Sequence, residues 1–206
     1  MVDDVAFVAE SLPGPPARVL EVGCGSGELA LELAAQGWDV LAVDPEAPDG
    51  PIFRRVTLEE LDEPGPFDAV VARRSLHHIH DLEAAVVKIA TLLAPGAPFV
   101  LVEFAHERLD RETADWYLGQ FAALHAAGST GAPPRDVGKL RAEYDGLHTS
   151  EQMLAALRAR FDERQFERTP YLHGELGGVA SEALERTLIE AGAIEPTGFR
   201  WIGVAT

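Results

Sequence analysis

A glycine-rich turn between an apolar run and a helical pattern constrains the fold of this chain more than any other feature. The segment 19–30 reads VLEVGCGSGELA, and its apolar start predicts a β-strand. The residues after the glycines continue at helical spacing as far as Gly37. Because Gly23, Gly25 and Gly27 carry no β-carbon, a ligand can approach the backbone of the turn closely. The helix directs its free N–H groups and positive dipole end at that ligand, so the sequence predicts a ligand-binding strand–turn–helix unit.

The turn alone leaves two ligand classes open. Gly25, Gly27 and Ala30 also satisfy the G-x-G-x-x-G/A pattern of dinucleotide-binding folds, and glycine-rich turns recur by chance. The next predicted strand, WDVLAVDP, carries Asp44 at its end, about 20 residues beyond the glycines. A carboxylate in this place can accept hydrogen bonds from both hydroxyls of a ribose. The two features together predict a ligand that contains a ribose.

Two later segments extend the pattern to a family. Residues 67–81, FDAVVARRSLHHIHD, join a strand to a His-His pair, and residues 92–104, LLAPGAPFVLVEF, join a helix end, a Pro-Gly turn and a strand. With the glycine turn and Asp44, they resemble the class I S-adenosylmethionine-dependent methyltransferases. The family's E-x-G-C-G-x-G, acidic strand end, LHHxxD and L-x-P-G-G-like turn appear here in order, with the last motif reading LAPGA. The resemblance is good over about the first half and follows only the outline of the second.

The resemblance implies an α/β fold with a doubly wound, mostly parallel seven-stranded sheet, helices on both faces, an antiparallel last strand and a helical insertion after strand five. With 206 residues, the chain forms one methyltransferase-like domain, 1–206, by the usual prior, and it would bury about 70% of its extended-chain surface. Asp81 is the expected cap of a helix that runs to Leu93. The other predicted elements are helices over 2–12, 110–127, 151–161 and 180–192, and strands over 163–173 and 197–205.

The stretch 105–148 is the only one long enough to close over a second substrate, and it begins where the fifth strand ends. It contains the predicted helix 110–127 and a loop of Gly, Ser, Pro and Thr, a composition suited to a cover that opens. We therefore predict that 105–148 is a lid insertion. Limited proteolysis should cut it between Ser129 and Arg135.

One segment departs from the family pattern. Where a crossover helix is usual, residues 45–51 read PEAPDGP, and the prolines exclude a helix there. A parallel crossover usually takes a dozen or more residues, so we expect a short third strand over about 53–57. An under-covered edge of this kind is usually blocked or paired. The sequence therefore predicts a homodimer that buries the region 45–56.

The charge of the chain argues against nucleic acid as the methyl acceptor. Lys+Arg number 17 against 34 Asp+Glu, which gives a formal net charge of −17. Nucleic-acid binders neutralise phosphates with clustered basic residues, and this chain would be repelled over most of its surface. The single cysteine, the lack of a signal-peptide pattern and the lack of an apolar run of membrane-span length predict a cytoplasmic protein with no membrane partner.

The resemblance implies S-adenosyl-L-methionine as the cofactor. Glu21 would lie near its amino group, Asp44 would take the ribose hydroxyls, and Arg73 would offer its backbone carbonyl. The full set of cofactor positions that the resemblance implies is Glu21, Gly23, Cys24, Gly25, Gly27, Asp44, Pro45, Thr57, Leu58 and Arg73. Glu21 could equally be a strand-end charge that the amides of the turn satisfy, and Cys24 a small buried residue without reactivity.

Three histidines, at 77, 78 and 80, raise the question of a metal. Metal sites usually collect three or four ligands with a further carboxylate or thiolate nearby, and only Asp81 adjoins these residues. We expect no metal site. The LHHxxD context predicts that one imidazole packs under the cofactor loop and that one faces the acceptor.

Methyl transfer from a sulfonium is an in-line displacement, so the chain has to align two reactants and sometimes remove a proton. Candidate bases are Glu103, His106 and His78, and candidate residues for a small-molecule acceptor are Arg74, His77, Trp116 and Tyr117. Arg73 and Arg74 could pair with an anionic acceptor or merely with surplus carboxylates. Aromatic residues at helical spacing are also often plain core.

Two other functions stay open at this point. A nicotinamide-dependent oxidoreductase shares the glycine turn and Asp44, although Lys88 and Lys139 both lack the tyrosine neighbour of a typical reductase pair. A non-catalytic module could also keep the cofactor site without activity. The sequence identifies neither the acceptor nor the atom that receives the methyl group.

Overall fold

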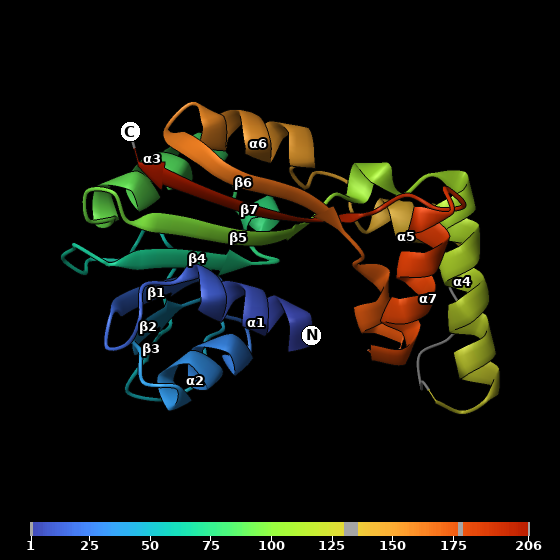
Figure 1. Cartoon of the computed structure of the whole chain (residues 1–206), viewed down its shortest axis with the longest axis horizontal. Coiled ribbons are helices and arrows are strands. Elements are labelled where there is room, and N and C mark those ends of the chain that lie inside the picture. The colour runs from blue at the N-terminus through green and yellow to red at the C-terminus, as the bar shows by residue number, and fades with distance from the viewer. Residues whose placement is uncertain (1, 130–135, 177–178, 206) are drawn as a thin grey trace.

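A single seven-stranded sheet forms the centre of the computed structural model, which describes residues 2–129, 136–176 and 179–205 (Figure 1). The strand order is β3-β2-β1-β4-β5-β7-β6. Strands β1 to β5 pair in parallel, and β7 runs antiparallel to both of its neighbours. The strands are β1 Arg18–Val22, β2 Asp39–Val43, β3 Phe53–Arg54, β4 Ala69–Arg73, β5 Pro98–Phe104, β6 Phe161–Thr169 and β7 Gly198–Ala205. The predicted fold class is confirmed.

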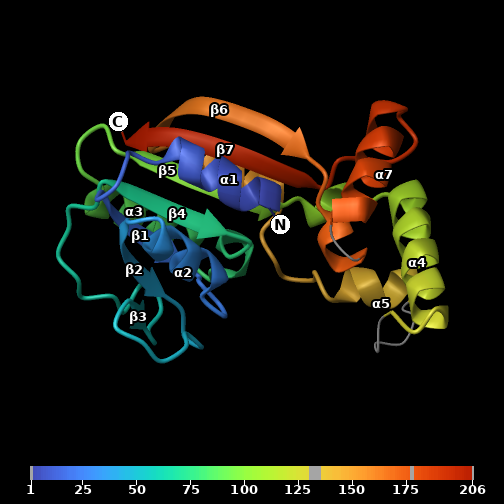
Figure 2. The same cartoon turned by 60° about the horizontal axis from the view of Figure 1, so that its bottom comes forward.

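Helices cover both faces of this sheet, which explains why its central strands are apolar almost throughout (Figure 2). On one face lie α1 (Val2–Ser11) and α2 (Glu28–Ala35), whose Val8, Leu29 and Leu33 pack on side chains of β1, β2, β4 and β5. On the other face lie α3 (Leu82–Leu92) and α6 (Ser150–Arg158). The carboxyl ends of β1, β2 and β4 therefore share one edge of the sheet, with helices above and below.

Local capping explains where two of these helices begin. The carboxylate of Asp81 accepts from the amide of Ala84 at 3.0 Å, as its place before an apolar period predicted. Thr149 and Gln152 form a capping box at the start of α6, in which each side chain bonds the backbone of the other. Both caps follow from residues within one turn of the helix start.

The connection after β2 lacks a helix, as the prolines predicted, and β3 is shorter than the predicted 53–57. Phe53 is 8% exposed and Ala47 fully buried, and both belong to the core between the sheet and α2. A β-carbon on Gly27 would lie 2.5 Å from the Phe53 ring, so that ring packs directly against the glycine turn. The chain itself thus covers this face. A homodimer through 45–56 stays a prediction.

A group of helices stands beyond one end of the sheet in both views (Figures 1 and 2). This outer helical group consists of α4 (Arg111–Ala126), α5 (Val137–Ala142), the 3₁₀-helix η3 (Leu172–Leu176) and α7 (Val179–Glu190). It has its own apolar core, made of Phe104, Leu109, Ala114, Tyr117, Phe121, Leu140, Leu172 and Leu176. The helix predicted over 180–192 therefore packs on η3 and not on the sheet. Most of the predicted cleavage loop, 130–135, lies outside the described residues.

Two glycines of the turn offer a matched test of this packing. Gly23 and Gly25 both have positive φ, of 75° and 50°. A β-carbon on Gly23 would lie 2.2 Å from Cβ of Ser75, whereas one on Gly25 would meet nothing within 4 Å. We expect Gly25→Ala to lower the free energy of unfolding by about 1–2 kcal/mol, the cost of the left-handed backbone. Gly23→Ala should cost about 2 kcal/mol more, because Ser75 must move. Urea unfolding measures both, and equal losses would contradict this packing.

Candidate functional site

A cavity of about 1010 Å³ lies at the carboxyl ends of β1, β2 and β4. It is lined by the glycine turn, the end of β2, the segment after β3 and the segment after β4. Ligands of open α/β sheets bind at this edge, where the strand order reverses. All of the predicted cofactor residues except Glu21 and Gly27 line it, namely Gly23, Cys24, Gly25, Asp44, Pro45, Thr57, Leu58 and Arg73.

The end of β2 and the glycine turn are tied to each other through Asp44. Its Oδ2 accepts from the amide of Gly25 at 3.0 Å, and its Oδ1 accepts from the amide of Glu46 at 2.8 Å. An ionised carboxylate has about four acceptor sites, so Asp44 keeps capacity for ligand hydroxyls. The amides of Gly23 and Cys24 both donate to the carbonyl oxygen of Val43, which fixes the turn against β2.

Two further residues of the turn, Gly27 and Cys24, are explained by packing and burial. Gly27 precedes α2 with φ of 82°, and its lack of a side chain admits the Phe53 ring. Burial, followed by the neighbouring carboxylates of Glu21 and Asp44, raises the pKa of the Cys24 thiol to about 12. Cys24 is therefore a thiol and not a thiolate at neutral pH.

Glu21 lies behind the turn and not in the wall of the cavity. The residue is 2% exposed, and its buried Oε2 has no hydrogen-bond partner in the described part of the chain. Burial raises the pKa of this carboxyl to about 7, against the opposing effects of Arg73 and of the Ala30 amide. An unpartnered buried carboxylate oxygen is costly, which accounts for the tendency of Glu21 to hold its proton.

The raised pKa of Glu21 makes stability depend on pH. The folded protein holds this proton between pH 4.5 and about 7 whereas the unfolded chain releases it, so unfolding free energy should fall as pH rises through this window. Across the whole window, the decrease in unfolding free energy should be about 3 kcal/mol. Glu21→Gln should remove the slope, and the exposed Glu32→Gln should keep it. Chemical denaturation at pH 5 and pH 8 measures the difference, and parallel pH curves for wild type and Glu21→Gln would exclude this carboxyl.

The chain after β4 forms the other wall of the cavity through Arg73, Arg74, Ser75 and His78. The hydroxyl of Ser75 donates to the carbonyl oxygen of Val22 at 2.7 Å and so joins this wall to β1. Partial burial, and then the neighbouring His77, lowers the pKa of His78, so its imidazole is neutral near pH 7. The side chain of Arg73 lies 3.9 Å from Glu28 at the start of α2.

A fully buried carboxylate, Glu103, holds this wall from behind. Its Oε1 accepts from the amides of Ser75 and Leu76 at 2.8 and 2.6 Å, with a longer contact of 3.4 Å to the amide of His77. Its Oε2 lies 2.5 Å from Nδ1 of His77 and accepts from the amide of Phe104 at 2.9 Å. Glu103 is outside the lining of the cavity. This geometry suits a positioning carboxylate and not a base that meets the acceptor.

The remaining predicted residues also lie away from the cavity wall. His77 is 5% exposed, and its ring contacts that of His78 with centroids 4.1 Å apart and planes tilted by 41°, so it stands behind a lining residue. His106 stacks on Tyr144 at 5.6 Å. Tyr117 is 1% exposed inside the outer helical group, and Trp116 packs against that core. The structure thus brings together the cofactor residues, Arg74 and His78, and it leaves the predicted aromatic wall elsewhere.

Several lining residues carried no signal that singled them out in the sequence. They are Ser26, Glu28, Glu46, Val56, Glu59, Ser75 and Ile79. Most of them are adjacent in sequence to motif residues, so including the residues next to each motif would have identified them. Among the described residues, no group of three or more His, Cys, Asp or Glu could hold a metal ion. No described helix has both the length and the apolar character that crossing a membrane requires.

The role of Glu103 predicts a specific sensitivity. Glu103→Gln places an amide N–H₂ among N–H donors, so at least one donor loses its acceptor in a buried site. We expect a loss of about 3 kcal/mol or more in unfolding free energy. Glu112→Gln, on the exposed start of α4, should change it by less than about 0.5 kcal/mol. Calorimetry compares the two, and a Glu103→Gln protein as stable as wild type would remove the anchoring role.

The sheet order, the antiparallel last strand and the cavity at the carboxyl edge define a Rossmann-like fold of the class I methyltransferase type. Residues 1–130, more than half of the chain, match the methyltransferase domain family. The chain belongs to this family and is a methyltransferase by descent. The match covers β1 to β5 and α4 and stops before the second half of the outer helical group.

Individual relatives agree with the family. An uncharacterized methyltransferase of Mycobacterium tuberculosis is 32% identical over 156 residues, which cover 63% of this chain and 76% of that one. A ubiquinone biosynthesis O-methyltransferase of Xylella fastidiosa is 37% identical over 105 residues, but these span only 44% of this chain and 43% of the relative. The crystal structure of an S-adenosylmethionine-dependent methyltransferase from Mesorhizobium loti superposes with a TM-score of 0.63 at 17% identity, covering 98% and 96% of the two chains.

Proposed function

We propose that the protein transfers a methyl group from S-adenosyl-L-methionine to a small-molecule acceptor. The observation that carries this proposal is the cavity at the carboxyl edge of β1, β2 and β4, which has Asp44 on one side of the glycine turn and Arg73 on the other. Membership of the methyltransferase family supports the reaction type. It also disfavours a nicotinamide-dependent oxidoreductase, which shares only the glycine turn and the acidic strand end.

The residues present fit this cofactor on three counts. The buried, unpartnered Oε2 of Glu21 suits the ammonium group of its methionine end. The open space at Gly25, where an added β-carbon would meet nothing within 4 Å, allows close approach to the turn. Asp44 has acceptor capacity for the ribose hydroxyls. Pro45, Thr57 and Leu58 would surround the adenine.

The bound cofactor would supply a methyl group on a positively charged sulfur. In-line displacement needs no metal and no covalent intermediate, so the chain's part is to hold two molecules in line, exclude water and accept a proton where the acceptor carries one. His78 is the residue we assign to the proton. It lines the cavity, and its lowered pKa keeps the imidazole neutral and able to accept a proton at Nδ1 or Nε2. Glu103 and His77 would hold the loop in place.

The nature of the acceptor is supported by charge and by architecture. The chain carries a formal net charge of −17, which opposes a nucleic-acid polyanion. Helices α4 and α5, which belong to the proposed lid 105–148, stand beyond the ends of β4 and β5 (Figure 2). We propose that this segment closes over a small molecule.

Binding of the cofactor product tests the first half of the proposal. S-adenosylhomocysteine at about 100 times its Kd should raise the free energy of unfolding by about 2.7 kcal/mol. Asp44→Ala should abolish most of this gain, because the ribose hydroxyls lose their acceptor. Asp49→Ala is the matched control, since that nearby side chain is fully exposed. Thermal denaturation measures all three proteins. A melting temperature that responds to NADH and not to S-adenosylhomocysteine would overturn the assignment.

Transfer itself separates an enzyme from a binding module. Radioactivity from S-adenosyl-L-methionine labelled in the methyl group should appear in a small-molecule fraction when the protein is incubated with a metabolite extract. The His78→Ala protein should bind S-adenosylhomocysteine but transfer more slowly if the acceptor is protonated. Binding without transfer to any fraction would favour a non-catalytic module.

A further inference from the structure

Arg74 adopts a backbone conformation that arginine rarely takes. Its φ is 56°, and it is the one non-glycine residue with positive φ in the described ranges. Such strain persists where surrounding contacts hold it, and it gathers at binding sites. Here the amide of Arg74 donates to the carbonyl oxygen of Val102 at 2.8 Å, which fixes the residue between β4 and β5. The fold therefore holds a strained residue at the edge of the cavity.

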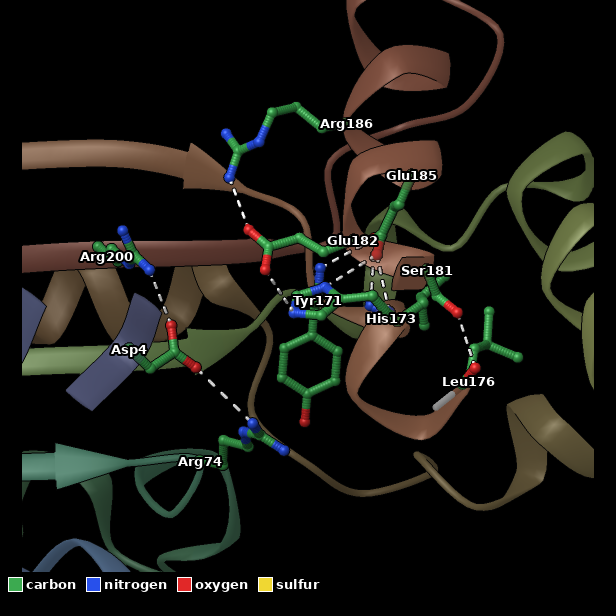
Figure 3. Close-up of polar contacts among 11 residues, drawn as sticks. Asp4, Arg74, Tyr171, His173, Leu176, Ser181, Glu182, Glu185, Arg186 and Arg200 are labelled. Carbon is green, nitrogen blue, oxygen red and sulfur yellow. Dashed lines mark hydrogen bonds and ion pairs between the residues drawn. The ribbon is translucent and has the colours of Figure 1, made fainter. Parts of the chain in front are cut away.

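Arg74 is one of the residues that line the cavity, and its side chain is 31% exposed. Figure 3 shows it reaching from the end of β4 toward Asp4 of α1 and Tyr171. Oδ2 of Asp4 is 3.7 Å from the guanidinium, which is beyond hydrogen-bond distance, while Oδ1 of Asp4 accepts from Arg200 at 3.0 Å. Among the described residues the guanidinium N–H groups of Arg74 make no hydrogen bond, and Nε is buried without a partner.

Tyr171 gives this guanidinium a fixed platform. The guanidinium carbon lies over the Tyr171 ring, 5.1 Å from its centroid. The ring stacks on Phe104 with centroids 4.3 Å apart and planes inclined by 12°, and the Tyr171 amide donates to the buried carboxylate of Glu185 at 2.9 Å. A cation held over a rigid aromatic face loses little freedom when it binds an anion, so its donors are pre-organised.

A planar guanidinium with unused donors matches a carboxylate, which accepts two parallel N–H bonds from it. We propose that Arg74 binds a carboxylate of the methyl acceptor, so that the acceptor is a small organic monoanion. This inference rests on the proposed function, because it concerns which acceptor the methyltransferase takes. Arg73 is less suited to this task, since only 15% of its side chain is exposed, against 31% for Arg74.

The charges around the cavity favour a carboxylate over a doubly charged phosphate. The acidic residues that line it are Glu28, Asp44, Glu46, Glu59 and Asp81, against Arg73 and Arg74. Asp4 also lies beside the guanidinium. Each further negative charge on the ligand adds repulsion from these groups and from a chain of net charge −17. A monoanion gains the Arg74 contact with the least repulsion.

Benzoate and benzamide form a matched pair of probes, because they share shape and differ in charge. The protein is first saturated with S-adenosylhomocysteine, and binding of each probe is then followed by NMR titration. Benzoate should bind at least tenfold more tightly than benzamide, and phenyl phosphate more weakly than benzoate. Arg74→Gln should lower benzoate affinity at least tenfold while the Kd for S-adenosylhomocysteine stays within twofold. Arg55→Gln, whose side chain is 60% exposed and contacts Asp49 and Ala47, should change neither.

A third variant distinguishes binding of a carboxylate by Arg74 from a purely structural role of this residue. Arg74→Lys keeps the positive charge without the two-pronged donor geometry, so benzoate should bind with an affinity between those of wild type and Arg74→Gln. A purely structural residue would change both probes equally and leave their ratio intact. Equal affinity for benzoate and benzamide, or benzoate binding that Arg74→Gln leaves unchanged, would overturn the inference. Tighter phenyl phosphate would point to a phosphate acceptor and also overturn it. Failure of S-adenosylhomocysteine to bind would refute the proposed function instead.

Discussion

The buried carboxylate of Glu103 is the interaction on which the cavity depends. It lies in an apolar core where an unpaired charge would be very costly, yet five N–H groups surround it. Those donors belong mainly to the chain that follows β4. Because Glu103 holds these donors in place, it also positions Ser75, whose hydroxyl donates to Val22 of β1, and His78, which lines the cavity. One charge on β5 therefore shapes a wall that is built from β4.

The outer helical group repeats this arrangement with different residues. The carboxylate of Glu185 accepts from the amides of Tyr171, Leu172 and His173 and lies 3.1 Å from Nδ1 of His173. Burial alone would raise the pKa of Glu185, but the hydrogen bonds from His173 and these amides hold it below its usual range. In both places a carboxylate from one element anchors a short 3₁₀-helix and its histidine: Glu103 anchors η1 (Leu76–His78), and Glu185 anchors η3. Arg74 and Tyr171 connect the two anchored segments.

The parts of the fold that the sequence predicted depend on local chemistry. Gly23 and Gly25 form a turn between adjacent elements, and Asp81 caps α3 through the amide of Ala84. Asp44 was predicted beside the turn from the family pattern, and its carboxylate accepts from the amide of Gly25, 19 positions away. The parts that it missed depend on contacts between distant residues. Glu103 and His77 are 26 positions apart, and a strand-end glutamate looks the same in sequence whether it serves as a base or as an anchor. Nothing local to 180–192 shows that α7 packs on η3 and not on the sheet. The aromatic period of α4 predicted an apolar face but not which neighbour covers it.

The outer helical group has an apolar core of its own, separate from the two cores that flank the sheet. Substitutions inside that third core can alter its shape while the two cores that flank the sheet keep their packing, because side chains more than about 7–10 Å apart contribute to stability almost independently. The matched family region ends at residue 130, so η3 and α7 come from the part of the chain outside the match. We therefore expect substitutions within this third core to change the helices beyond the end of the sheet more than the two cores that flank the strands.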